Sequence, residues 1–140
     1  MNHRPRHFQL HELVPQDVHE ARGEAAWELL DPRILITADA IRDTFGPTTI
    51  NDWRDGGLFK ESGLRSFDST TGAKLSQHRY GRAIDVKCKD ATPQEVHAYI
   101  LANPDKFPHV TTLEDIAATP SWTHCDCRNN VGSAIRIVKP

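Results

Sequence analysis

The sequence lacks any long apolar run. Nowhere do roughly 20 consecutive apolar residues occur, which is the length that an α-helix needs to cross a bilayer. The first residues, which read MNHRPRHFQLHEL, also lack the apolar stretch of a secretory signal peptide. We therefore predict that the chain has no membrane partner and that it is synthesised in the cytoplasm without a signal peptide.

Cysteine is scarce, and neither sign of charge dominates. The three cysteines are an odd number and too few for a disulfide framework, which predicts folding in a reducing compartment. Lysine and arginine number 17 against 19 aspartates and glutamates, which gives a formal net charge of -2. Such a balance provides no general attraction to nucleic acid, so we expect no nucleic-acid partner.

The composition is that of one globular domain. Of the 140 residues, 38% are hydrophobic and 26% are charged, which is typical of folded chains of this length. No internal repeat, low-complexity tract or linker-like run divides the sequence. We predict a single domain over residues 1–140, with a poorly ordered segment at residues 1–12.

Two amphipathic helices are marked by signals at their ends. The first is predicted over residues 31–45, between an Asp-Pro start and a Gly-Pro stop, with apolar residues at helical spacing. The second follows the capping box Thr-Pro-Gln-Glu at 92–95 and ends at the Asn-Pro pair 103–104. We expect the second helix to cover one face of a sheet.

Short runs with strand-like composition come mostly late in the chain. They lie at about 82–87, 110–113, 122–127 and 134–138. Because helices come early and in the middle, we predict an α+β fold with a small, mainly antiparallel sheet and flanking helices. The stretch 56–74 is predicted as a long loop, and long loops in compact domains are often functional.

The segment from His78 to Asp85 contains two potential metal ligands. Their separation is odd, which would put them on opposite faces of a regular strand, so a turn must intervene and Gly81 can provide it. After that turn, Ala83 and Asp85 share one face, and the small Ala83 side chain leaves room for a ligand. Ile84 is predicted to point into the core on the other face.

A third potential ligand, His124, lies in a run that alternates between two faces. Trp122, His124 and Asp126 share one face, while Cys125 and Cys127 share the other as predicted core residues. Two imidazoles and one carboxylate leave one position of a tetrahedral zinc ion open, as catalytic zinc requires. The spacing by itself only suggests such a site, because eight histidines are scattered through the chain and most histidines bind no metal.

Three motifs together resemble a known family. Residues 76–85 read S-x-H-x-x-G-x-A-x-D, residues 122–124 read W-x-H, and residues 63–66 are similar to an upstream G-[YF]-R-[ST] segment. This set resembles the zinc D-alanyl-D-alanine carboxypeptidases, a family that includes phage L-alanyl-D-glutamate endopeptidases and shares its fold with hedgehog signalling domains. The resemblance spans residues 63–128, with the motifs in the order found in the family.

The resemblance implies a set of site residues. It implies one Zn²⁺ ion per chain, bound by His78, Asp85 and His124. It also implies that Arg65 contacts the substrate carbonyl or the developing oxyanion, a role that suits a charged donor in a partly dry cleft. Two further residues would line the site: Ser76 and Tyr80.

The resemblance also implies an activity and a setting. The activity is hydrolysis of an amide bond in peptidoglycan stem peptides by metal-activated water. We expect the protein to be a monomer whose partner is the peptidoglycan peptide. We also expect it to be encoded by a phage and to be either released to the cell wall or carried in a virion. Which bond is cleaved, whether cleavage is exo or endo, and which divalent ion is native stay open at this point.

The chain departs from the family pattern at one position. Many members have an acidic general base three residues before the last zinc histidine, but this chain has Ser121 there, and a serine hydroxyl is too weak a base. We predict that Glu114 takes this role, with Asp126 either orienting His124 or serving as the base itself. The alternative is a zinc-containing binding or virion structural module on the same fold, with weak or no hydrolase activity.

Overall fold

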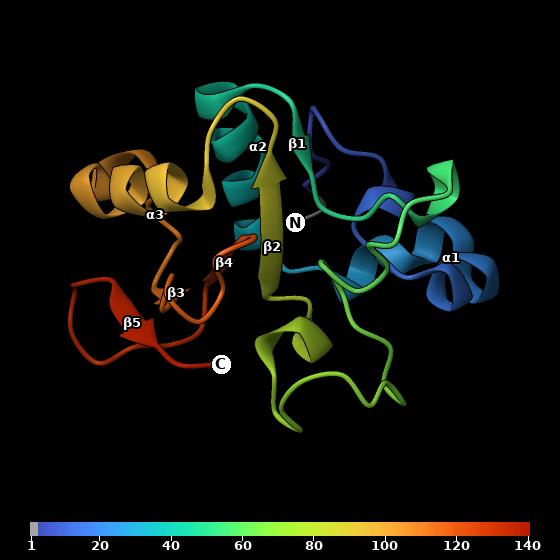
Figure 1. Cartoon of the computed structure of the whole chain (residues 1–140). Helices are drawn as coiled ribbons and strands as arrows, with labels where there is room; N and C mark the ends of the chain where they lie inside the picture. Colours follow the sequence, from blue (N-terminus) through green and yellow to red (C-terminus); the bar gives the residue numbers. More distant parts are fainter. Residues whose placement is uncertain (1–2) are drawn as a thin grey trace.

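The computed structural model describes residues 3–140, which form an α+β fold (Figure 1). Within these residues, a five-stranded mixed sheet in the order β1-β2-β4-β3-β5 is accompanied by three α-helices and several short 3-10 helices. The strands are β1 Thr48–Thr49, β2 Ala83–Cys88, β3 Thr112–Glu114, β4 Thr123–Asp126 and β5 Arg136–Val138. The α-helices are α1 Gln16–Arg22, α2 Pro32–Phe45 and α3 Pro93–Ala102.

The two helices expected from the sequence, α2 and α3, are both confirmed. The Asp31 side chain accepts a hydrogen bond from the backbone N–H of Arg33 and so caps α2, which ends at Gly46 with a φ of 81°. The Thr92 side chain accepts a hydrogen bond from the N–H of Glu95 at the start of α3. Both helices depend on local signals, which is why the sequence predicts them well.

Four of the strands match the predicted runs. β2, β4 and β5 agree with those runs to within a residue or two, and β3 begins at Thr112 instead of 110. The pairs β1–β2, β2–β4 and β3–β4 are antiparallel, as expected for a mainly antiparallel sheet, whereas β3 and β5 are parallel. Nothing in the sequence predicts the two-residue strand β1, because so short a run has no recognisable period.

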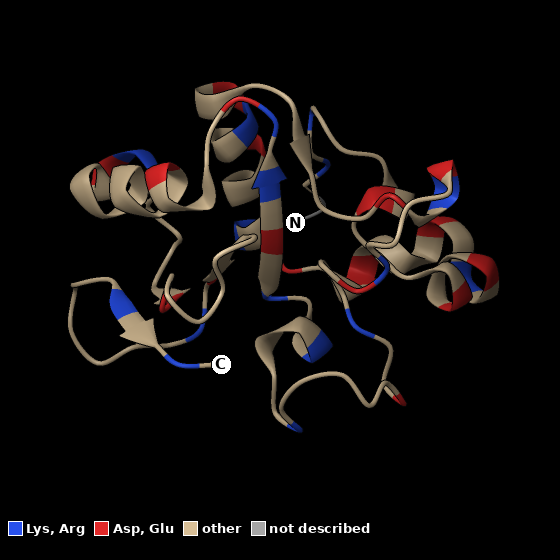
Figure 2. Ribbon diagram, viewed as in Figure 1, with Lys and Arg blue, Asp and Glu red and all other residues tan. Residues whose placement is uncertain are grey.

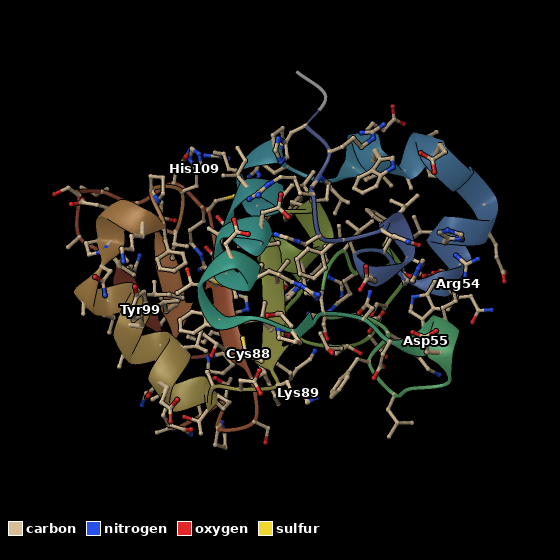
Figure 3. All side chains as sticks on the ribbon, turned by 90° about the horizontal axis from the view of Figure 1, so that it is seen from above. Arg54, Asp55, Cys88, Lys89, Tyr99 and His109 are labelled. Atoms are coloured by element: carbon tan, nitrogen blue, oxygen red, sulfur yellow. The ribbon has the colours of Figure 1, made fainter. Side chains whose placement is uncertain are left out.

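The hydrophobic core lies between α2 and the sheet. Ile34 and Ile41 of α2 are buried, and they belong to the same apolar cluster as Ile84 and Val86 of β2. Figure 1 shows α2 passing behind β2, and the view from above in Figure 3 shows α3 beside them. Because Ile84 and Val86 face the core, the alternate residues of β2 face away from it, and the candidate site lies on that side.

The N-terminal segment packs against the core, in contrast to the poorly ordered end expected for residues 1–12. Phe8, Leu10 and Leu13 are buried, and the Leu13 carbonyl accepts a hydrogen bond from the N–H of Leu64 at 2.8 Å. These apolar residues stand among charged ones without a regular period, so their sequence resembles a polar tail. Residues 1 and 2 of the expected segment lie outside the described residues.

Residues 56–74 form the predicted long loop, since this described stretch contains no helix or strand. Arg79 holds part of the loop in place. Its guanidinium donates hydrogen bonds to the carbonyls of Phe67 at 3.0 Å and Ser69 at 2.5 Å. The loop is therefore anchored to the 3-10 helix Gln77–Tyr80, which carries the first candidate ligand.

Cys125 and Cys127 are buried, as predicted, and both are free thiols, as is Cys88. Among the described helices, none combines the length and the apolar composition that a membrane-spanning helix needs. Figure 2 shows lysine and arginine interspersed with aspartate and glutamate along the ribbon, which agrees with the nearly neutral net charge.

Candidate metal centre

The turn between His78 and Asp85 is built around Gly81. His78 lies in the 3-10 helix Gln77–Tyr80, and Gly81 follows it in the left-handed conformation with a φ of 67°. A Cβ atom at Gly81 would lie only 1.9 Å from the Leu29 carbonyl oxygen, so the backbone of the turn packs too closely for any side chain. The predicted bend before β2 is therefore confirmed.

Asp85 and His124 are brought together by the register of the sheet. In the antiparallel pair of β2 and β4, Asp85 is directly opposite His124, and Ala83 is opposite Asp126. Directly opposite residues on one face of an antiparallel pair have neighbouring side chains. The two strands thus place a carboxylate beside an imidazole, and the turn at Gly81 adds the second imidazole.

The three predicted ligands converge on one point. His124 Nδ1 lies 2.9 Å from Asp85 Oδ1 and 3.2 Å from His78 Nε2, and His78 Nε2 lies 3.3 Å from Asp85 Oδ1. Ligand atoms around a tetrahedral zinc ion with bonds of ~2.0–2.1 Å are separated by roughly 3.3 Å. This triangle therefore fits a zinc ion, and His78, Asp85 and His124 form a group that could hold one.

The outer nitrogens of both imidazoles are fixed by acceptors. His78 Nδ1 lies 2.8 Å from the Gly63 carbonyl oxygen, and His124 Nε2 lies 2.9 Å from Asp126 Oδ2. A carbonyl or carboxylate oxygen can only accept, so each outer nitrogen carries the proton and each inner nitrogen can offer its lone pair to a metal. Such outer contacts orient metal-binding histidines and make them better ligands.

Asp126 has the position of a supporting residue. Its side chain is fully buried, and it accepts a hydrogen bond from Arg128 Nε at 2.8 Å in addition to its contact with His124. Burial opposes ionisation, but the hydrogen bonds from His124 and Arg128 hold the pKa of Asp126 below its usual value. Asp126 is not one of the described residues that line the cavity around the candidate ligands. The geometry favours its orienting role over that of a base.

Glu114 lies beside the ligands. Because β3 pairs with β4 so that Leu113 is opposite Cys125, the next residue on β3 reaches the position of His124. Glu114 Oε1 is 3.7 Å from His124 Nδ1, and Glu114 lines the same cavity as the three ligands. Burial raises the pKa of its carboxyl group above the usual value. Ser121, by contrast, is exposed.

Arg65 and Ser76 also line the cavity, as expected from the resemblance. Arg65 is only 8% exposed, and its Nη1 donates hydrogen bonds to Ser76 Oγ and the Thr71 carbonyl, both at 3.3 Å. Its Nε has no hydrogen-bond partner among the described residues. A buried N–H without an acceptor is costly, and this one is available to a ligand.

Tyr80 does not line the cavity, contrary to expectation. Its side chain is half exposed, and its ring lies 5.9 Å from the guanidinium carbon of Arg82. Side chains two residues apart in a 3-10 helix point in different directions, so the turn that directs His78 inward directs Tyr80 outward. The motif spacing alone did not reveal this, since it depends on the type of helix.

The centre as a whole favours a positive charge. Burial opposes the protonation of His124, but its hydrogen bonds to Asp126 and Asp85 raise its pKa to about 9. Burial likewise opposes the ionisation of Asp85, yet the two histidines keep the pKa of Asp85 well below its usual value. The carboxylates of Asp85 and Glu114 lie beside the point where the ligand atoms converge, and Asp126 acts from the far side of His124, so a cation is stabilised there.

Lys87 is a residue of the site that the motifs do not include. Its Nζ donates hydrogen bonds to the Ile50 carbonyl at 2.7 Å and to Ser62 Oγ at 2.9 Å, and it lies 3.9 Å from the centroid of the Phe59 ring. Burial lowers its pKa to about 8, and Asp85 counters part of that effect. The alternation of β2 was the available signal, because Lys87 shares a face with Asp85.

Comparison with models of protein families, with curated proteins and with solved structures gives no match for this chain. The geometry and chemistry of the site therefore carry its interpretation, together with the motif resemblance.

Proposed function

We propose that the chain is a zinc-dependent hydrolase that cleaves an amide bond in peptidoglycan stem peptides, on a fold of the D-alanyl-D-alanine carboxypeptidase and hedgehog type. One observation carries the proposal. His78, Asp85 and His124 form a triangle of zinc dimensions beside Glu114, in a cavity of about 300 Å³. Three protein ligands and an adjacent carboxylate are the parts that a catalytic zinc site requires.

Each residue of the site has a chemical task in this proposal. A zinc ion supplies Lewis acidity, which lowers the pKa of a water molecule and polarises a carbonyl group. Glu114 accepts the proton of the attacking water and later delivers it to the leaving amine. Arg65 donates hydrogen bonds to the oxygen on which negative charge develops. No covalent intermediate with the protein is needed, since the nucleophile is water.

The substrate follows from the motif resemblance. The motifs at 63–66, 76–85 and 122–124 are similar to those of enzymes that act on peptidoglycan peptides, and the site has the cavity and donors to bind a peptide. A phage lytic or virion-associated enzyme is the setting that this resemblance suggests. The protein would meet the cell wall after release from the host or as part of a particle.

The test measures metal content and cleavage on the same samples. Wild type, His124→Ala and Glu114→Gln are purified, their zinc content is determined by mass spectrometry, and each is incubated with purified peptidoglycan. We expect one zinc per chain and soluble fragments from wild type, zinc without fragments from Glu114→Gln, and neither from His124→Ala. The variant His109→Ala is the matched control, because His109 lies outside the cavity and its loss should change nothing.

Other outcomes lead to different conclusions. Zinc binding without any cleavage by wild type would favour a binding or structural module over a hydrolase. Cleavage that is lost in His124→Ala but retained in Glu114→Gln would move the role of the base to Asp126 or Asp115. The absence of bound zinc in wild type, with folding intact, would contradict the proposal.

A further inference from the structure

Two neighbouring cavities meet at the metal centre. One, of about 300 Å³, contains the three ligands and Glu114. The other, of about 390 Å³, extends toward residues 58–62. Four residues line both cavities: Arg65, Thr71, Asp85 and Trp122. Because Asp85 is one of the three ligands, the second cavity begins at the metal centre itself. Both volumes lie in the lower part of the range of ~300–1,000 Å³ that is typical of ligand sites.

Strand β2 connects the two cavities. Asp85 and Lys87 are two positions apart on β2, so their side chains share a face, and both line the second cavity. The N–H of Asp85 donates to the Ser62 carbonyl at 2.7 Å, which holds the 58–62 segment alongside the strand. A molecule in the second cavity would therefore lie along β2, in line with the metal centre.

The second cavity presents mainly apolar groups. The ammonium of Lys87 is occupied by the Ile50 carbonyl and Ser62 Oγ and lies over the Phe59 ring. Its charge is thus already satisfied within the protein. The apolar surface that the cavity offers to a ligand comes from Leu58, Phe59 and Trp122, and the charged Lys60 and Glu61 also line it. This side of the metal centre suits an apolar substituent.

Exposed apolar side chains lie at both ends of the combined groove. Leu58 is 89% exposed and Phe59 41% exposed in the second cavity, and Leu75 is 72% exposed in the first. Large apolar side chains that gather on a surface next to polar groups are characteristic of binding sites. Here they lie on either side of the metal centre.

Two unpaired donors lie where the cavities meet. Arg65 Nε and Trp122 Nε1 are both buried and have no hydrogen-bond acceptor among the described residues. Both residues line both cavities. Buried N–H groups normally donate a hydrogen bond, so a ligand that brings an acceptor would satisfy these two donors. A peptide backbone offers such acceptors, because every residue has a carbonyl oxygen.

We infer that the groove binds an extended peptide that continues on both sides of the cleaved bond, so that the protein acts as an endopeptidase with an apolar residue in the second cavity. This deepens the proposed function and rests on it. An exopeptidase that releases one terminal residue needs space for a single residue on one side and a closed end. In this chain both sides have a cavity, and Arg65 and Trp122 lie between them to donate hydrogen bonds to the peptide.

The test uses the zinc-loaded full chain and stem peptides that keep the muramic acid on their N-terminus, each with a free or an amidated C-terminus. We expect both forms to be cut at similar rates, with no free amino acid among the products identified by mass spectrometry. Leu58→Ala and Leu75→Ala should each raise KM several-fold with unchanged zinc content. Phe67→Ala is the matched control, because Phe67 is 98% exposed and lines neither cavity.

The failures of the two proposals can be distinguished. Cleavage of the free peptides alone, or release of single amino acids, would overturn the endopeptidase inference and leave the hydrolase intact. An increase in KM for only one of the two leucine variants would also overturn it. No cleavage of any peptide by the zinc-loaded protein would refute the hydrolase, and the endopeptidase inference with it.

Discussion

Glu114 Oε1 on β3 lies 3.7 Å from His124 Nδ1 on the adjacent strand β4. This contact places beside the candidate ligands the carboxylate that we predicted as the general base, because Ser121 occupies the position at which many family members have an acid. Glu114 belongs to β3, whereas Ser121 lies shortly before β4, and the pairing of β3 with β4 brings Glu114 next to His124. The candidate site therefore contains a carboxylate beside its three candidate ligands although residue 121 is a serine.

We predict that Glu114→Gln lowers kcat by a factor of roughly 10²–10⁴, the range for loss of a general base. Zinc content should stay at one per chain, because Glu114 is not in the ligand triangle. Rates on peptidoglycan and zinc analysis measure both effects. Asp115→Asn, which changes the neighbouring carboxylate, is the control and should keep its activity. Full activity of Glu114→Gln would exclude it as the base.

Removal of the Asp126 carboxylate should weaken zinc binding. Asp126 orients His124 through a 2.9 Å contact, and loss of such a supporting partner typically lowers metal affinity by roughly 10–100-fold. We expect this loss for Asp126→Asn in competition with a chelator of known affinity. Asp126→Asn should still cleave peptidoglycan when zinc is in excess. An unchanged affinity would show that Asp126 does not orient His124.

Two glycines in the left-handed conformation allow a matched comparison. Gly81→Ala would place a Cβ atom 1.9 Å from the Leu29 carbonyl oxygen, whereas Gly56→Ala would meet nothing within 4 Å. We expect Gly56→Ala to lower the free energy of unfolding by about 1–2 kcal/mol, the cost of the conformation alone. Gly81→Ala should cost more and also lose zinc, because the turn positions His78. Equal denaturation midpoints for the two variants would contradict this prediction.

Acid should remove the contribution of Asp31 to stability. The hydrogen bonds from Arg33 lower the pKa of Asp31 in the folded state, so its ionised form stabilises the protein. That contribution is complete above the unfolded-state pKa of about 3.9 and is lost as the pH falls through the folded-state pKa.

The variant Asp31→Ala tests this behaviour and the helix cap together. Loss of the cap should lower the free energy of unfolding by about 0.5–2 kcal/mol at neutral pH. Urea denaturation of both proteins from pH 7 to pH 3 gives the difference at each pH. It should be constant down to about pH 4 and then shrink. If the difference in the free energy of unfolding between the two proteins grew on acidification, the pKa of Asp31 would be raised in the folded state and not lowered.

The elements that the sequence predicted best are those with local causes. The helix over 31–45 is encoded by a cap and a stop within one segment, and the bend before Asp85 is encoded by Gly81. The candidate ligands His78, Asp85 and His124 converge, in agreement with the set that the motif resemblance implied. Their convergence needs only two correct strands and one turn, all of which have signals in the sequence.

The features that the sequence did not predict depend on distant partners. Phe8 and Leu10 become core residues only because other segments cover them, and their spacing shows no period. Lys87 acquires its partners from the loop around Ser62, and Trp122 lines a groove whose other wall is more than fifty residues earlier in the chain. The burial and contacts of these residues depend on packing between remote segments. A single sequence does not show how such segments align with one another.

The contact between Leu13 and Leu64 has a consequence for how the protein folds. The Leu64 N–H donates to the Leu13 carbonyl, and the preceding carbonyl, that of Gly63, accepts from His78. The candidate ligand His78 is therefore oriented through a chain of contacts that starts in the N-terminal segment. Contacts between remote residues form slowly because they require the closure of long loops. Maturation of the metal centre would thus follow global folding, and zinc added early in refolding would meet an incomplete set of ligands.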